Sequence, residues 1–156
     1  MFRCFIALTV IAFGSFVFAD ASGFDEQEVT VKSTYKEVCD FIESHSDDII
    51  KSSKSEVLER KGTIVKIKNN NEQEQIVFTI QEKNKRGDYG SELVKSHQGG
   101  LTSQKTSIKV TKGSKGTTIS IKVEAEIENP RVGPVLFKVG IKKSVKGMKE
   151  LFRHNL

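Results

Sequence analysis

Histidine is the side chain that most often binds metals and transfers protons near neutral pH. The sequence has three of them, His45, His97 and His154, which lie far apart and at no metal-ligand spacing from a cysteine or an acidic residue. It contains no phosphate-binding loop, no nucleophile elbow and no HExxH motif. We therefore predict no catalytic residue, no metal site and no cofactor.

Two other groups of reactive side chains have structural explanations. Cys39 stands in an apolar helical segment with only His45 nearby as a base, so we expect a small buried hydrophobic residue and not a nucleophile. Asp47 and Asp48 are adjacent carboxylates, but they follow Ser46 at the start of an expected helix, where carboxylates satisfy free N–H groups and favour the helix dipole. We therefore expect Cys39 to pack in the core, and Asp47 and Asp48 to stabilise the start of a helix.

The composition is that of a globular chain, with 156 residues, 37% hydrophobic and 29% charged. This length suits one domain with a small appendage. The formal net charge of +5 permits contact with an anionic surface, although a charge of this size is also typical of a solvated face.

The N-terminus has the three parts of a secretory signal peptide. Met1–Arg3 is positively charged and Cys4–Phe18 is largely apolar. Ala19 and Ala21 suit the −3 and −1 positions for cleavage after Ala21, and Val17 and Ala19 suit them for cleavage after Ala19. The alternative is an uncleaved anchor, for which the apolar run is short against the roughly 20 residues that span a bilayer. We predict a signal peptide over residues 1–21, export by the Sec route to the periplasm or the extracellular space, and no nucleic-acid partner.

The C-terminal third combines a long strand with a long helix. Apolar and polar residues alternate from Thr117 to Glu128, which indicates a strand with one buried face, and Pro130 ends it. After Pro134 the period becomes helical, with one apolar stripe: Phe137, Ile141, Val145, Met148, Leu151 and Phe152. A helix lying across the sheet buries both apolar faces.

Upstream, the pattern predicts a strand over 27–32 and then two short helices, the first with a capping box formed by Thr34 and Glu37. Five further strands are expected between Ser55 and Val110, with turns about ten residues apart, which predicts an antiparallel meander. Residues 22–156 therefore form a single domain.

This order of elements resembles the START-like, or helix-grip (SRPBCC), superfamily of polyketide cyclases, plant allergens and lipid-transfer domains. The resemblance covers about Glu26 to His154 and is carried by the element order and by the run from Ile119 through Pro134 to Phe152. It implies an α+β fold in which a curved antiparallel sheet of about seven strands wraps the C-terminal helix, with two short helices after the first strand. No catalytic residue is carried over from the family.

The resemblance also implies an apolar cavity between the sheet and the long helix. We predict that the ligand-binding residues are Phe78, Ile119, Ile121, Val123, Val135, Leu136 and Val139. The last three widen the apolar arc at the start of the helix, either as a cavity mouth or by packing against the short helices around Phe41 and Ile50. A cyclase or hydrolase would need a titratable residue facing the cavity, and the inward positions are expected to be apolar.

The other face of the C-terminal helix is basic. Lys138, Lys142, Lys146, Lys149 and Arg153 could contact an anionic membrane or envelope polymer, or could be simple solvated surface. We therefore predict an exported, monomeric, non-catalytic domain that binds a small hydrophobic or lipid-like ligand. The alternative is an interaction module with a filled core that uses this basic face.

Overall fold

The computed structural model describes residues 20–52, 55–69, 75–81, 88–96, 101–128 and 133–156, and within β4 and the second half of β5 it describes the backbone but not the side chains. The expected signal peptide therefore lies outside the described residues, apart from its last two positions. Its division from the domain stays a prediction.

The described chain forms an α+β fold with the predicted order of elements, which confirms the predicted fold class. The elements are β1 (Ala21–Val31), α1 (Tyr35–Ser44), α2 (Ser46–Ser52), β2 (Ser55–Lys61), β3 (Ile64–Asn69), β4 (Gln75–Gln81), β5 (Asp88–Ser96), β6 (Leu101–Gly113), β7 (Gly116–Ile127) and α3 (Pro134–Asn155). One difference is that β1 begins at Ala21, six residues before the strand predicted from Gln27.

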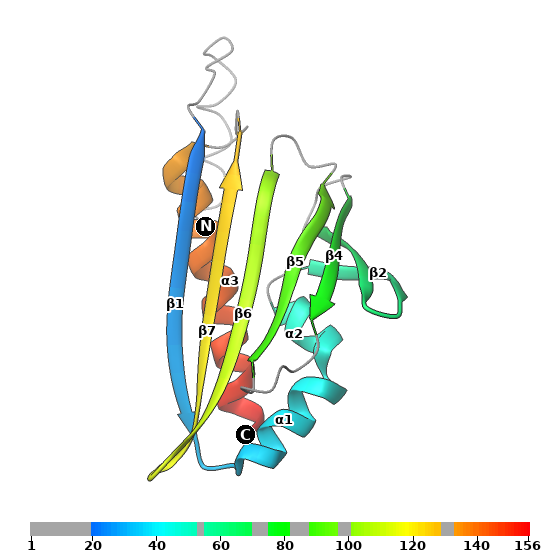
Figure 1. Ribbon diagram of the computed structural model, residues 1–156. Helices are drawn as coiled ribbons and strands as arrows, with labels where there is room; N and C mark the ends of the chain where they lie inside the picture. Colours follow the sequence, from blue (N-terminus) through cyan, green and yellow to red (C-terminus); the bar gives the residue numbers. More distant parts are fainter. Residues whose placement is uncertain (1–19, 53–54, 70–74, 82–87, 97–100, 129–132) are drawn as a thin grey trace, which may run out of the picture.

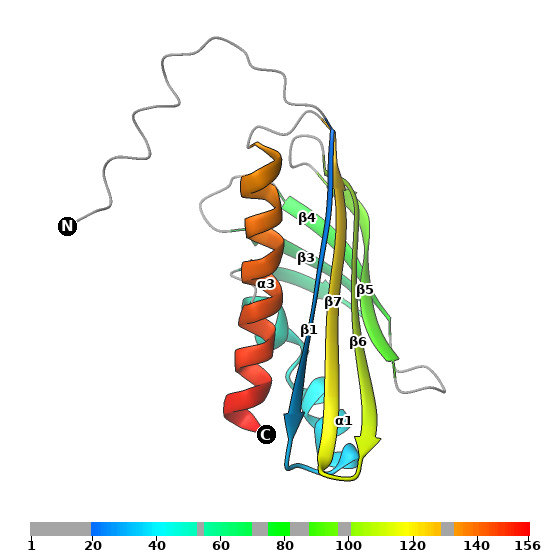
Figure 2. The ribbon, with the colours of Figure 1, turned by 90° about the vertical axis from the view of Figure 1, so that its left-hand side faces the viewer.

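The strands form one antiparallel sheet in the order β1-β7-β6-β5-β4-β3-β2 (Figure 1). Neighbouring strands from β2 to β7 follow one another along the chain, whereas β1 pairs with β7 from the other end of the sequence. Figure 2 shows the sheet curving around α3, so that β1 and β7 run along the helix while β3 and β4 pass behind it. The long C-terminal helix therefore lies against the concave side of a bent sheet.

Local signals in the sequence account for the ends of several elements. The Thr34 N–H donates to Glu37 Oε2 at 2.7 Å, and the Glu37 N–H donates to Thr34 Oγ1 at 3.3 Å, which confirms the capping box of α1. Pro134 occupies the first turn of α3, where its missing N–H costs nothing. Gly116 has φ of 139°, and a Cβ at this position would collide with the carbonyl oxygen of Val31, so the β6–β7 turn needs glycine there.

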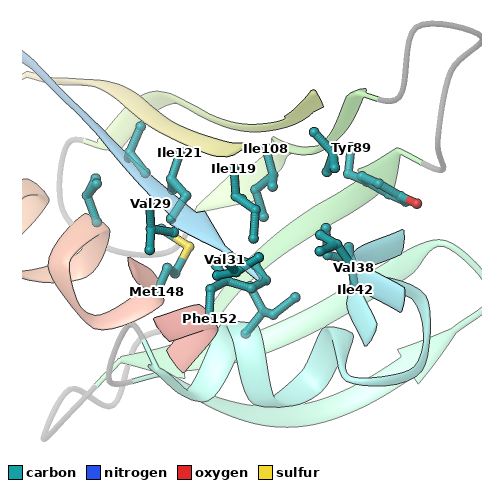
Figure 3. Packing of buried hydrophobic residues seen from close by; sticks show 14 of the residues in the cluster. Val29, Val31, Val38, Ile42, Tyr89, Ile108, Ile119, Ile121, Met148 and Phe152 are labelled. Atoms are coloured by element: carbon teal, nitrogen blue, oxygen red, sulfur yellow. The ribbon is translucent and has the colours of Figure 1, made fainter. Parts of the chain in front are cut away.

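The main core lies between the sheet, α1 and the C-terminal half of α3. Figure 3 shows Met148 and Phe152 pointing from α3 into this core. All six predicted inward residues of β7 are buried: Thr117, Ile119, Ile121, Val123, Ala125 and Ile127. Cys39 is also buried there, as predicted.

A second and smaller core lies under β2 and β3. It contains Val65 and Ile67, with Ile50 and Val57 packed against it. Leu101, at the start of β6, is half-buried and packs against both cores. The side chains described in the interior therefore form two clusters that Leu101 connects.

Candidate functional site

The register of the strands shows which residues share the concave face, because directly paired residues of an antiparallel sheet point to the same side. Near α1, the inward rows consist mostly of large apolar residues: Val29, Ile119 and Val110, then Gln27, Ile121, Ile108 and Tyr89. Further from α1, the rows become small or polar: Asp25, Val123, Thr106 and Ser91, then Gly23, Ala125 and Gln104. The inner face therefore changes character along the strands.

Three polar residues on β5 and β6 form what we call the inner polar cluster: Ser91, Gln104 and Thr106. They face the concave side, yet each is only half-buried. By contrast, Ile119 and Ile121, on the same face near α1, are 0% exposed. Solvent therefore reaches the inner face of the sheet at the inner polar cluster but not at these two isoleucines.

The position of α3 explains this difference. Gly23 lies so close to the helix that an added Cβ would stand 2.9 Å from Ile141 Cδ1 and 3.3 Å from Lys138 Cγ. The glycine lets α3 settle on β1, at the edge of the sheet. Among the described elements, the α3 backbone comes within 8 Å of β1, β7 and α2 but not of β5 or β6, so the helix lies nearer to the β1 edge of the sheet.

The inner polar cluster has unused hydrogen-bonding capacity. None of its three side chains is hydrogen-bonded to another group within the described part of the chain. Ser91 and Thr106 are direct register partners, which places their Cβ atoms about 4.5–5.5 Å apart. A small molecule with a hydroxyl, carbonyl or amide group could bond to both.

Two other polar groups on the inner face already have partners. The Gln27 Nε2 donates to Asp25 Oδ2 at 2.9 Å on β1. The Tyr89 hydroxyl donates to Glu43 Oε1 at 2.8 Å, which connects β5 to α1. Burial is the main cause that raises the pKa of Tyr89 above its ordinary value, and bonding to Glu43 adds to it, so this phenol stays a donor at neutral pH.

The predicted ligand-binding residues do not come together on one surface. Ile119, Ile121 and Val123 are buried in the main core. Phe78 belongs to β4, and its side chain lies outside the description. Their role in binding stays a prediction.

The other three predicted ligand-binding residues lie at the start of α3. Val135, Leu136 and Val139 are 74%, 60% and 38% exposed. At 3.6 residues per turn they stand opposite the stripe of α3 that packs on the sheet. This exposure rules out the interpretation that they pack against the short helices.

Of the predicted basic residues, Lys142, Lys146 and Arg153 share that side of the helix, whereas Lys138 and Lys149 lie at its flank, next to the stripe that packs on the sheet. Lys138, Lys142, Lys146 and Arg153 are exposed and Lys149 is half-buried. We call Val135, Leu136, Val139, Lys142, Lys146 and Arg153 the outer α3 face. It is apolar toward the start of the helix and basic toward its end.

The expectation that inward positions are apolar is wrong at Asp25, Gln27 and the inner polar cluster. Ile108 and Val110 are the clearly apolar residues of β6, and their alternation was not extended backward along the strand in the prediction. The same period of two places Thr106 and Gln104 on the buried face. That extension was the available signal.

Neither a metal centre nor a membrane span is found in the described segments. No three His, Cys, Asp or Glu side chains gather there as a metal ion would require. No helix among them combines the length and the hydrophobicity needed to cross a bilayer.

Comparison with known proteins identifies the fold. No protein-family model and no curated protein matches the sequence. Among solved structures, a START superfamily protein from Mycobacterium smegmatis is similar with a TM-score of 0.59 and 10% identity, over 85% of this chain and 99% of that one.

Two plant proteins are also similar in structure. Norcoclaurine synthase from Thalictrum flavum has a TM-score of 0.55 and 14% identity, over 86% of this chain and 88% of that one. Major latex-like protein 151 from Panax ginseng has a TM-score of 0.53 and 11% identity, over 87% and 99%. The chain therefore has the same helix-grip fold as these proteins, as the sequence predicted.

Proposed function

We propose that this protein is an exported, non-catalytic START-like domain that binds a small apolar or lipid-like molecule between its sheet and α3. The observation that carries the proposal is the partial exposure of the inner polar cluster on the concave face of the sheet. The half-buried side chains of Leu101 and Phe137 offer apolar contact to such a molecule.

The fold supports this proposal. A structure of norcoclaurine synthase, similar to this chain with a TM-score of 0.56, is a complex with dopamine and hydroxybenzaldehyde. The proposal assigns no reaction, because the inner polar cluster consists of two alcohols and an amide, which do not titrate near neutral pH. The acid of the same row, Asp25, lies two strands from Thr106 and already accepts a hydrogen bond from Gln27. Export is proposed from the apolar N-terminus.

Native mass spectrometry tests ligand binding on protein purified from the compartment to which it is exported. We expect a retained adduct of lipid-like mass and a rise in melting temperature with fatty alcohols, fatty acids or sterols. A mass equal to that of the bare polypeptide, together with no thermal shift, would contradict the proposal.

A variant pair locates the site. Thr106→Phe places a ring on the inner face and should displace the adduct. Thr111→Phe makes the same change on the same strand at an exposed position of the outer face, and should retain it. Loss of the adduct in both variants would remove the assignment to the inner face.

A second candidate function rests on the outer α3 face. Three exposed apolar residues and a basic stretch on one side of a helix are the features of a segment that lies on an anionic membrane surface. Reversing Lys142, Lys146 and Arg153 to Glu should abolish sedimentation with phosphatidylglycerol vesicles and leave sedimentation with neutral vesicles unchanged. Binding that survives the reversal would exclude this candidate.

A further inference from the structure

We infer that the bound molecule carries an uncharged hydrogen-bonding group, such as a hydroxyl or an amide, and seats it on Ser91, Gln104 and Thr106. This inference rests on the proposed function and specifies the chemistry of the ligand. It follows from the hydrogen bonds that these three side chains lack, from their spacing, and from the charges around them.

The spacing suits a single polar group. Ser91 and Thr106 stand directly opposite each other on neighbouring strands. Gln104 is two positions from Thr106 along β6, which separates their Cα atoms by about 7 Å. One hydroxyl between the strands can donate to one of these side chains and accept from another, because alcohols and amides do both.

Leaving these groups dry and unpaired would be unfavourable. A buried polar side chain without a partner loses its hydration and gains nothing in return. A wholly apolar ligand would impose that loss on the inner polar cluster. A ligand with its own hydrogen-bonding group restores the bonds and is therefore preferred.

The charges around the cluster favour a neutral group over an anion. In the described part of β6 and β7, the inward positions from Gln104 to Val110 and from Thr117 to Ile127 carry no charge. The charged side chain in the same row is Asp25, two strands from Thr106, or about 10 Å. A carboxylate ligand would meet this negative charge. Lys138 of α3 lies beside Gly23, two strands from Gln104, but its side chain is exposed and its charge is therefore screened by solvent.

The rest of the ligand meets apolar groups. Leu101 lies further along the inner side of β6, and Phe137 faces the sheet from α3, where its ring stands 3.9 Å from the position of a Cβ on Gly23. Both side chains are half-buried, so they have surface left to cover. The ligand is therefore an amphiphile with a neutral polar end.

Competition against a hydrocarbon dye tests this inference. The full mature protein is loaded with diphenylhexatriene, and decanol or decanoate is added as a competitor of equal chain length. We expect decanol to displace the dye at lower concentration than decanoate. Thr106→Val, which keeps the size of the side chain, should weaken decanol binding about fivefold, the equivalent of one neutral hydrogen bond of about 1 kcal/mol.

Matched controls separate this effect from damage to the fold. Thr111→Val and Ser103→Ala remove hydroxyls from exposed positions of the same strand and should leave decanol binding unchanged. Ser91→Ala should weaken it as Thr106→Val does. Dye binding itself should be retained by every variant, since the dye forms no hydrogen bonds.

Each outcome has one meaning. A preference for decanol that falls in the Thr106→Val and Ser91→Ala variants supports the inference. Dye binding with equal competition by decanol and decanoate, in the native protein and all variants, overturns the inference and leaves the proposed function standing. A protein that binds neither the dye nor either competitor contradicts both.

Discussion

The two ends of α3 should contribute very differently to stability. Phe152, near its C-terminus, is 0% exposed, and its ring packs edge-on against Phe41 with centroids 6.0 Å apart and an interplanar angle of 65°. Replacing such a residue by alanine removes the transfer free energy of the ring and leaves a cavity, at a cost of about 3–5 kcal/mol. Leu136, near the N-terminus, is 60% exposed, and Leu136→Ala should change the free energy of unfolding by about 0.5 kcal/mol or less.

Urea unfolding followed by circular dichroism measures both changes. A loss of about 3–5 kcal/mol is a large part of the 5–15 kcal/mol that stabilises a typical domain. In a chain of this size it lowers the melting temperature by roughly 10 °C. Phe152→Leu, which keeps most of the apolar volume, should recover more than half of the loss.

Similar losses for Phe152→Ala and Leu136→Ala would refute this reasoning. They would mean that the start of α3 is packed as tightly as its end. An unchanged slope of the free energy against urea is needed for the comparison, because a changed slope indicates a different unfolded state.

Three further predictions concern other parts of the chain. Gly140→Ala should raise the free energy of unfolding by about 0.5–1 kcal/mol, because Gly140 is an exposed helical residue whose added Cβ would meet nothing within 4 Å; a destabilised variant in urea would contradict this. Glu37 accepts a hydrogen bond from the Thr34 N–H and a second from the Thr34 hydroxyl. The first of these contributes most to lowering the pKa of Glu37 below its ordinary value of 4.5. The stability that these two bonds contribute is therefore present above pH 4.5 and lost as the pH falls through the lowered pKa. Glu37→Gln should remove this part of the acid dependence of the melting temperature. Intact mass of the exported chain should show cleavage after Ala19, because Ala21 of β1 is buried and pairs with Ile127 of β7; an N-terminus at residue 22 would contradict this.

The sequence predicted the parts of the fold in which one face is consistently apolar. Every second residue of β7 is buried, and four residues of the predicted α3 stripe, Ile141, Val145, Met148 and Phe152, are buried as well. These patterns are long and regular, so the period alone defines the element and its buried side. The capping box of α1 was found in the same way, since its spacing has one explanation.

The extent of β1 was not predictable from hydrophobic alternation. Its inward positions there are Gly23, Asp25 and Gln27, none of which is apolar and large. Its large apolar residue, Phe24, lies on the outer face and is 68% exposed. Pairing with β7 along its whole length holds this segment in the sheet. Such pairing between the two ends of the chain is a tertiary effect, which a local pattern does not contain.

The candidate site escaped prediction for a related reason. Apolar periodicity points to Ile119 and Ile121, which the core already covers. A binding surface must instead keep inward residues that no other side chain covers. Which positions these are depends on where α3 lies across the sheet, and Gly23 contributes to that placement through its contact with Ile141.

The two proposed functions use opposite sides of one helix, so they are separable by mutation. The inner polar cluster belongs to β5 and β6, whereas the outer α3 face points away from the sheet. Thr106→Val should change ligand selectivity without changing sedimentation with vesicles. Reversing Lys142 and Lys146 should do the opposite. If either change affected both measurements, the ligand and the membrane would not use separate sites, and the division into an inner and an outer site would be wrong.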